Sequence, residues 1–175
     1  MSDMPKYTLA EVNALTPSEF HEIFINVVEL CSVAAVFVSA LSPFHSLESL
    51  IRGFDVYLSQ LNVTDKLNVL RHHPDLAGKL AESGNMSYES QLEQQQAGLN
   101  SLTKAQKHEL SELNDEYKAK FGFPFVICVR ETNKLEAILA AMKVRLNNSV
   151  EEEVEVGINE VKKISRLRVL QIVKE

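Results

Sequence analysis

Apolar residues recur at three- and four-residue spacing along most of the chain, which is the period of an α-helix that buries one face. The first such stripe consists of Phe20, Ile23, Phe24, Val27, Val28 and Cys31. A second stripe extends from about Ser46 to Leu61, and a long one from Val154 to Leu170. The pattern predicts an all-α protein.

Three capping boxes, each a Ser or Thr followed three residues later by Glu or Gln, mark helix starts. They are Thr16 with Glu19, Thr103 with Gln106, and Ser149 with Glu152. The first is followed directly by Pro17, a residue that favours the first helical position. We therefore expect helices to begin at these three places.

Two shorter helices are expected in the middle of the chain. Thr64 or Asp65 can cap a helix that must end near His73, because Pro74 disfavours the helical conformation of the residue before it. Ser87 can open another helix that continues through Leu99.

Only the run from Phe125 to Val129 is β-like, and no other segment offers it a sheet partner. It is interpreted as a buried extended segment or a helix start. The chain also has no internal repeat, no low-complexity tract and no long linker. We therefore expect one compact single-domain bundle of about eight helices over residues 1–175.

Composition narrows the class of protein further. Of the 175 residues, 45% are hydrophobic and 24% are charged, as is usual for a globular domain, and the net charge is −6. This acidic balance disfavours a nucleic-acid partner, because phosphate binding requires clustered Lys and Arg. No signal peptide or apolar run of roughly 18 residues occurs, so we expect a cytoplasmic protein that does not enter a membrane.

The run from Arg71 to Asp75 is the first candidate for chemistry. It places His73 at a helix exit beside Pro74, where an imidazole can face a cavity and exchange protons near neutral pH. A surface or capping histidine is the alternative. The adjacent His72 does not suggest a metal site, because no further His or Cys follows at ligand spacing.

The helix that opens at Ser87 carries the second candidate. Polar residues interrupt its apolar stripe at positions i, i+3 and i+4, which lie on one helix face: Ser90, Glu93 and Gln94. A solvated face is the alternative, since glutamines occur on several sides of this helix.

Two further segments could contribute to a pocket. Phe123, Pro124 and Phe125 follow a helix stop and could form a wall that offers backbone N–H and C=O groups to a ligand. Arg145 occurs at a predicted helix end, where a guanidinium could bind a carboxylate or a urea-like group. Core packing and a favourable helix dipole are the respective alternatives.

Taken in order, these motifs resemble those of the OHCU decarboxylases, which act on 2-oxo-4-hydroxy-4-carboxy-5-ureidoimidazoline in urate degradation. The similar runs are residues 73–79 (His-Pro-Asp-Leu-Ala-Gly-Lys), Ser90 through Leu99, residues 121–130 and residues 145–147. The resemblance covers nearly the whole chain. In this family a glycine is common where Ala77 stands, and a tryptophan often follows the first helix, whereas this chain has no tryptophan.

The resemblance implies a homodimeric all-α carboxy-lyase that releases CO2 from a small-molecule substrate and forms (S)-allantoin without a cofactor or metal. His73, Glu93 and Arg145 fall on its principal active-site positions. The resemblance also implies a supporting or substrate-binding role for Pro74, Ser90, Gln94, Phe123, Pro124, Phe125, Val126 and Ile127.

Two other functions are compatible with these residues. The chain could be a non-catalytic helical module that binds ureido or hydantoin-like compounds or simply dimerises. It could also be a lyase or hydrolase that acts on a different heterocycle. The simultaneous presence of His73, Glu93 and Arg145 within their motifs favours the decarboxylase, since a binding module would need fewer of them.

Overall fold

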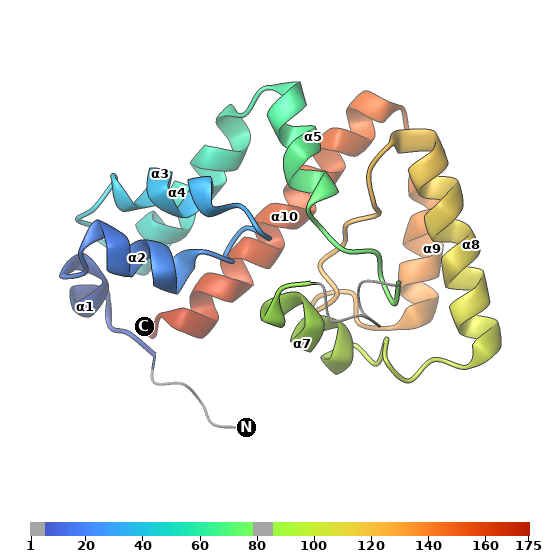
Figure 1. Cartoon of the computed structure of the whole chain (residues 1–175), viewed down its shortest axis with the longest axis horizontal. Helices are drawn as coiled ribbons and strands as arrows, with labels where there is room; N and C mark the ends of the chain where they lie inside the picture. Colours follow the sequence, from blue (N-terminus) through green and yellow to red (C-terminus); the bar gives the residue numbers. More distant parts are fainter. Residues whose placement is uncertain (1–5, 79–85) are drawn as a thin grey trace.

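The structure, a computed structural model, describes residues 6–78 and 86–175. Within these ranges the chain forms nine α-helices and no β-strand (Figure 1). They are α1 (Leu9–Asn13), α2 (Pro17–Phe24), α3 (Ser32–Ser39), α4 (Leu47–Gln60), α5 (Val63–Arg71), α7 (Tyr88–Gln96), α8 (Lys104–Phe121), α9 (Leu135–Arg145) and α10 (Val150–Ile172). The expected all-α fold is confirmed, with one helix more in the described part than predicted.

The predicted capping boxes all form. The side chain of Thr16 accepts a hydrogen bond from the backbone of Glu19, whose carboxylate bonds back to the Thr16 N–H at 2.8 Å. The boxes at Thr103 and Ser149 have the same reciprocal bonds. At α5 the cap is Asn62 instead of Thr64 or Asp65, because its side chain reaches the backbone N–H of Asp65 at 2.9 Å.

The first predicted helix is shorter than its apolar stripe. The stripe to Cys31 predicts one continuous helix, but α2 ends at Phe24 and α3 begins only at Ser32. Between them the carbonyl of Asn26 accepts a hydrogen bond from Arg168, and Leu30 has a positive φ of 48°. A contact with a distant helix therefore replaces local helical hydrogen bonding here.

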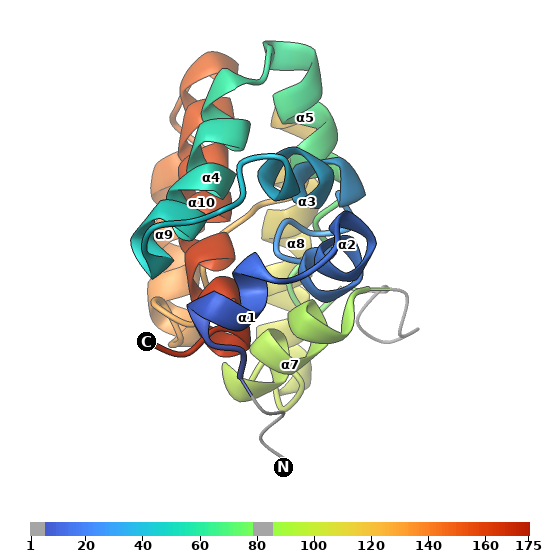
Figure 2. The ribbon, with the colours of Figure 1, turned by 90° about the vertical axis from the view of Figure 1, so that its left-hand side faces the viewer.

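The long helix α10 crosses the molecule and joins its two ends (Figures 1 and 2). It packs against α4, α5 and α8. At Gly157 a Cβ atom would lie 2.8 Å from the Leu70 side chain, so glycine allows the close approach of α5. Beyond α10, Val173 pairs with Tyr7 in an isolated parallel bridge, which ties the start of the described chain to its end.

One continuous hydrophobic core extends from Val12 to Val173. The β-like run from Phe125 to Val129 belongs to it: these residues are between 1% and 7% exposed and adopt neither helix nor strand. Its interpretation as a buried segment is confirmed. This segment brings its backbone to the centre of the molecule.

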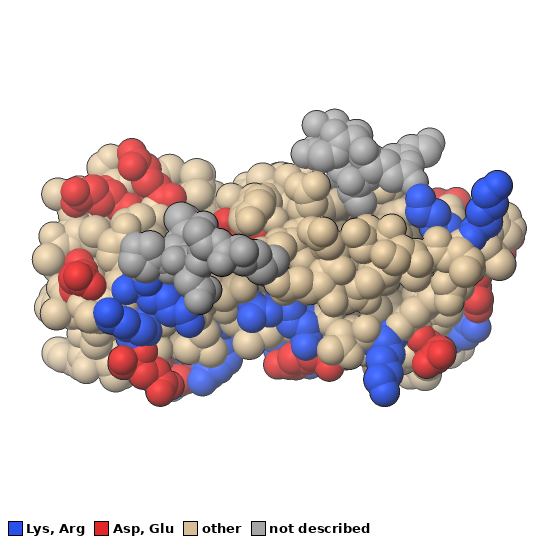
Figure 3. Space-filling model, turned by 90° about the horizontal axis from the view of Figure 1, so that it is seen from below, with Lys and Arg blue, Asp and Glu red and all other residues tan. Residues whose placement is uncertain are grey.

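Charged side chains of both signs are interspersed on the face shown in Figure 3.

Cys31 and Cys128 are free thiols, and Cys128 is buried. None of the helices in the described ranges is long and apolar enough to cross a membrane.

Candidate active site

A hollow of about 330 Å³, including the solvent space at its mouth, lies where α7, the exit of α5, the segment after α8 and α10 meet. Its polar lining residues are His73, Ser90, Glu93, Gln94 and Arg168. Its other lining residues are Pro74, Leu76, Phe125, Val126, Ile127, Val129 and Ile164. The hollow therefore sets a few polar groups into an apolar surface, as small-molecule sites usually do.

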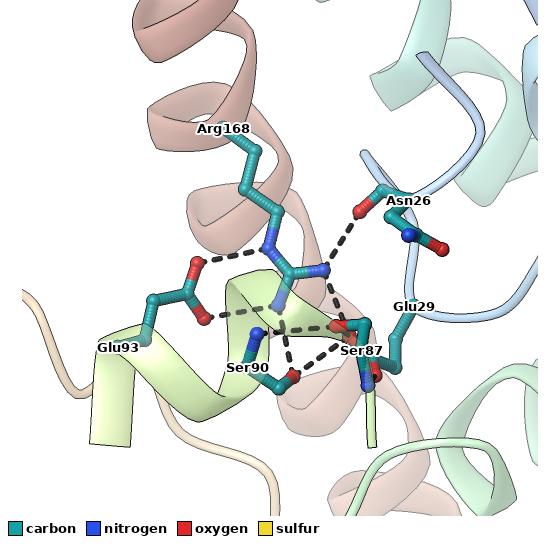
Figure 4. Close-up of polar contacts among 6 residues, drawn as sticks. All are labelled: Asn26, Glu29, Ser87, Ser90, Glu93 and Arg168. Carbon is teal, nitrogen blue, oxygen red and sulfur yellow. Dashed lines mark hydrogen bonds and ion pairs between the residues drawn. The ribbon is translucent and has the colours of Figure 1, made fainter. Parts of the chain in front are cut away.

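Arg168 and Glu93 form the central ion pair of this hollow (Figure 4). The Nε and Nη2 atoms of Arg168 donate to the two carboxylate oxygens of Glu93, each at 2.9 Å. Both side chains are buried, and the two parallel bonds match the planar guanidinium to the planar carboxylate. This pair fastens α7 to α10.

Every N–H group of the Arg168 guanidinium has an acceptor. Besides Glu93, its Nη1 donates to the Asn26 carbonyl at 2.7 Å and to Glu29 at 2.8 Å, and its Nη2 donates to Ser90 Oγ at 3.0 Å. These bonds use all five donors that an arginine has. The guanidinium is thus held in one orientation, and a ligand oxygen must share or displace one of these acceptors.

Glu29 lies behind Arg168 and is fully buried. Its carboxylate accepts hydrogen bonds from the Ser87 N–H at 3.1 Å, the Ser87 hydroxyl at 2.7 Å and the Ser90 hydroxyl at 2.7 Å, in addition to the bond from Arg168. Burial raises the pKa of Glu29, but the Arg168 charge and these hydrogen bonds outweigh it and hold that pKa below its usual value. The carboxylate is therefore ionised at neutral pH.

His73 is buried at the hollow, and its Nε2 atom has no hydrogen-bond partner among the described residues. Burial lowers the pKa of His73 to about 4; the Glu29 carboxylate opposes this shift, whereas Arg168 and His72 add to it. The imidazole is therefore neutral at pH 7. A neutral ring with an unpaired nitrogen can exchange a proton with a bound ligand.

Gln94 holds the loop that follows Pro74. Its Oε1 accepts from the Ala77 N–H at 2.9 Å, and its Nε2 donates to the Asp75 carbonyl at 3.2 Å. From α8, Lys118 forms an ion pair with Asp75 at 2.6 Å. The loop that presents Pro74 to the hollow is thus fixed by two helices. Lys79, the last residue of the corresponding sequence motif, lies outside the described residues.

Eight of the predicted site residues line the hollow: His73, Pro74, Ser90, Glu93, Gln94, Phe125, Val126 and Ile127. The other three, Phe123, Pro124 and Arg145, are not lining residues. The Phe123 ring instead packs against the ring of Tyr117, with 5.9 Å between the centroids.

Arg145 contacts two of the residues that line the hollow, Phe125 and Val126. Its Nη1 donates to the Val126 carbonyl at 2.8 Å, and its guanidinium carbon lies 4.2 Å from the centroid of the Phe125 ring. Its Nε forms a buried ion pair with Glu153, which also accepts a hydrogen bond from the Tyr117 hydroxyl at 2.6 Å. Arg145 thus supports two residues that line the hollow.

Sequence reasoning missed two buried charged residues: Arg168, which lines the hollow, and Glu29, which lies behind Arg168 and pairs with it. A signal was present for both. Arg168 falls on the apolar stripe of its helix, four residues after Ile164, and Glu29 follows two valines inside the first apolar run. A charged residue at a core position is buried only with a partner, so such positions indicate an internal ion pair.

Comparison with known proteins decides the family. Residues 13–170 match the family model of the OHCU decarboxylases. The chain belongs to this family. Its relatives include the 2-oxo-4-hydroxy-4-carboxy-5-ureidoimidazoline decarboxylases of Amia calva, 41% identical over 95% of this chain and 94% of the relative, and of Xenopus laevis, 39% identical over 94% and 93%.

Solved structures agree with the family assignment. A crystal structure of an OHCU decarboxylase in the presence of (S)-allantoin superimposes with a TM-score of 0.65, at 29% identity over 82% of this chain and 92% of that one. A crystal structure of (S)-allantoin synthase has a TM-score of 0.75 at 23% identity and shows the shared fold. It covers 95% of this chain, which spans 54% of the synthase chain.

Proposed function

We propose that this family member is a carboxy-lyase that converts 2-oxo-4-hydroxy-4-carboxy-5-ureidoimidazoline to (S)-allantoin and CO2. The observation that carries the proposal is the unpaired, buried Nε2 of His73 in the same hollow as the Glu93 and Arg168 pair. The names of the relatives from Amia calva and Xenopus laevis support this substrate.

The proposed chemistry needs no cofactor. In this substrate the carbon that bears the carboxylate and the hydroxyl is next to a ring imine. When the bond to the carboxylate breaks, CO2 leaves, the electron pair of that bond forms a C=C bond to the imine carbon, and the imine nitrogen takes up a proton. A second proton must then be added to the former imine carbon on one face of the ring, and the hydroxyl proton must be removed as its oxygen becomes a carbonyl. The protein has to orient the carboxylate out of the imine plane and move these protons.

We assign the acid and base steps at the hydroxyl and the reacting carbons to His73, since its neutral ring can accept one proton and later return it. Glu93 would orient the ureido and imine nitrogens, and the Ser90 hydroxyl would hold Glu29 and Arg168 in place. Gln94, Pro74 and the backbone from Phe125 to Ile127, which line the hollow, would shape and bind the substrate.

The role of Arg145 needs a revised proposal. Its position on the sequence suggests an active-site residue, but Arg168 is the arginine that lines the hollow. We propose that Arg168 supplies the positive charge at the substrate and that Arg145 positions Val126, whose carbonyl it binds. Arg168→Lys should then reduce turnover much more than Arg145→Lys.

The direct test generates the substrate in place with urate oxidase and the preceding hydrolase, adds this protein and follows (S)-allantoin by circular dichroism. We expect rapid formation of the (S) signal. The rate should fall at least a hundredfold in His73→Asn, about the contribution of acid–base catalysis, and by a similar factor in Glu93→Gln, because the substrate is misplaced. Spontaneous decay to racemate in the presence of folded protein would refute the proposal and leave a ligand-binding module.

We further propose that the chain acts as one domain over residues 1–175, as a cytoplasmic homodimer. Light scattering coupled to size-exclusion chromatography would test the dimer, and a monomer at micromolar concentration would contradict it.

A further inference from the structure

Among the residues that the structure describes, Glu29 is the one carboxylate that touches Arg168 without lining the hollow. It comes from the segment between α2 and α3, far from α7 and α10 in sequence. Its side chain takes four hydrogen bonds from Ser87, Ser90 and Arg168. Glu29 thus does not line the hollow itself, but it contacts two residues that do, Ser90 and Arg168.

We infer that Glu29 is a positioning residue for the proposed reaction: it fixes the Arg168 guanidinium against Glu93 and supplies a negative charge that His73 faces. The inference rests on the proposed function for its catalytic part only. The orientation of Arg168 can be tested whether or not the protein turns over this substrate.

The geometric argument comes from the bonds to Arg168. Glu93 accepts hydrogen bonds from Nε and from one N–H of Nη2, which lie on one edge of the guanidinium. If only this edge were held, the guanidinium plane would be free to tilt relative to the Glu93 carboxylate. Glu29 and the Asn26 carbonyl take the two N–H groups of Nη1 on another edge, at 2.8 and 2.7 Å. Two edges held by separate elements prevent that tilt.

Ser90 connects Glu29 to the Nη2 atom of Arg168, which also binds Glu93. Its hydroxyl donates to Glu29 at 2.7 Å and accepts from Arg168 Nη2 at 3.0 Å (Figure 4). Without an acceptor at Glu29, this hydroxyl can rotate and donate to another oxygen. The loss of Glu29 therefore disturbs the hydrogen bonds of two residues that line the hollow, Arg168 and Ser90.

The electrostatic argument concerns His73. The charged and titratable groups that act on it are Glu29 from the α2–α3 segment, Arg168 from α10 and the adjacent His72, while Glu93 of α7 lines the same hollow. Glu29 stabilises the imidazolium, and Arg168 destabilises it. Removal of the Glu29 charge therefore lowers the pKa of His73, both directly and because it leaves Arg168 less neutralised.

A second buried carboxylate provides a matched control. Glu153 is also fully buried and pairs with an arginine, Arg145, but it is not among the groups that act on the pKa of His73. Glu153→Gln removes a buried charge of the same kind away from the hollow. It therefore reports what a buried carboxylate contributes when it pairs with Arg145 and does not touch Arg168.

The experiment compares Glu29→Gln with Glu153→Gln. We expect Glu29→Gln to lower kcat about a hundredfold, the effect of a small displacement of reacting groups, and to move the acid-side inflection of the kcat/KM pH profile to lower pH. The neutral imidazole of His73 is the proposed base, so its protonation sets this acid-side inflection, and a lower pKa of His73 moves it to lower pH. Glu153→Gln should leave the inflection where it is.

The ¹⁵N-resolved guanidinium N–H signals of Arg168 provide a readout independent of turnover. We expect the wild type to show separate, slowly exchanging Nη signals, and Glu29→Gln to lose them while Glu153→Gln keeps them. If the wild type releases no CO2 but these signals behave as expected, the proposed function fails and the positioning of Arg168 stands. Unchanged signals, or unchanged kcat and inflection in an active enzyme, would overturn the inference.

Glu29→Asp tests the inference if Glu29→Gln does not fold. The charge is kept, but the carboxylate is shorter by one carbon–carbon bond of about 1.5 Å and cannot reach both serines and Arg168. We expect roughly a tenfold loss of kcat with the inflection near its wild-type position. Wild-type kcat in a folded Glu29→Asp protein would overturn the inference.

Discussion

Arg168 and Glu93 are joined by two hydrogen bonds of 2.9 Å each, although 75 residues separate them in the sequence. The pair is desolvated, and Glu29, Ser90 and the Asn26 carbonyl satisfy the remaining donors of the guanidinium. A buried pair of this kind is sensitive to any change in one partner, because the other charge then stays buried without its bonds.

Arg168→Lys is therefore expected to lower the free energy of unfolding by about 3–5 kcal/mol, since an ammonium cannot reproduce the planar fork. Arg166→Lys on the same helix is the matched control. Arg166 also makes a two-bond pair, with Glu48, but its side chain is 48% exposed, so the loss should be under about 1 kcal/mol. Urea denaturation of both variants measures the difference, and equal losses would contradict the prediction.

The low pKa of His73 predicts a pH dependence of stability. Its folded-state pKa is about 4, against an ordinary value of 6.5, so the unfolded chain binds more protons between these two values. The free energy of unfolding should therefore fall as the pH drops from about 6.5 to 4, by about 3 kcal/mol from this residue.

Urea denaturation at several pH values would measure this slope. His73→Asn should flatten it, whereas His108→Asn should not, because the His108 side chain is 75% exposed. A slope that is identical in the wild type and His73→Asn would show that the imidazole is not buried in its neutral form.

Ligand charge should couple to the protonation of His73. The carboxylates of Glu29 and Glu93 and the guanidinium of Arg168 together carry one net negative charge while His73 is neutral. An added carboxylate favours the imidazolium. Binding of an anionic analogue such as hydantoin-5-acetate should therefore take up protons at pH 6–7, whereas uncharged hydantoin should not.

Calorimetry in buffers of different ionisation enthalpy counts these protons. His73→Asn should abolish the uptake while the weaker binding remains measurable. Equal proton uptake with both ligands would place the titrating group elsewhere.

Ala77 has a positive φ of 50°, a region that costs an alanine roughly 1–2 kcal/mol and a glycine nothing. Glycine relieves this strain but loses more chain entropy on folding, which offsets part of the gain. Ala77→Gly should therefore raise the free energy of unfolding by only about 1 kcal/mol, without loss of turnover. Ala140→Gly, at an exposed position inside α9, should instead lower it by about 1 kcal/mol. Thermal unfolding of both variants gives the sign, and a loss of stability in both would refute the prediction.

The sequence by itself determined the local features of this protein. Capping boxes at Thr16, Thr103 and Ser149 form because their bonds join residues three positions apart, which no distant element can rearrange. The helical period likewise places Ser90, Glu93 and Gln94 on one face of α7, and all three line the hollow.

Only the tertiary structure decided which arginine enters the hollow and where the first helix ends. Apolar periodicity indicates that a face is buried, but it does not say which element covers it. The Glu29 and Arg168 pair joins residues 139 positions apart, and Arg168 also binds the Asn26 carbonyl, which a continuous helix beyond Phe24 would use for its own backbone bonding. Because a buried charge must find its partner wherever the fold brings one, these two features depend on the packing of α10 against the rest of the chain.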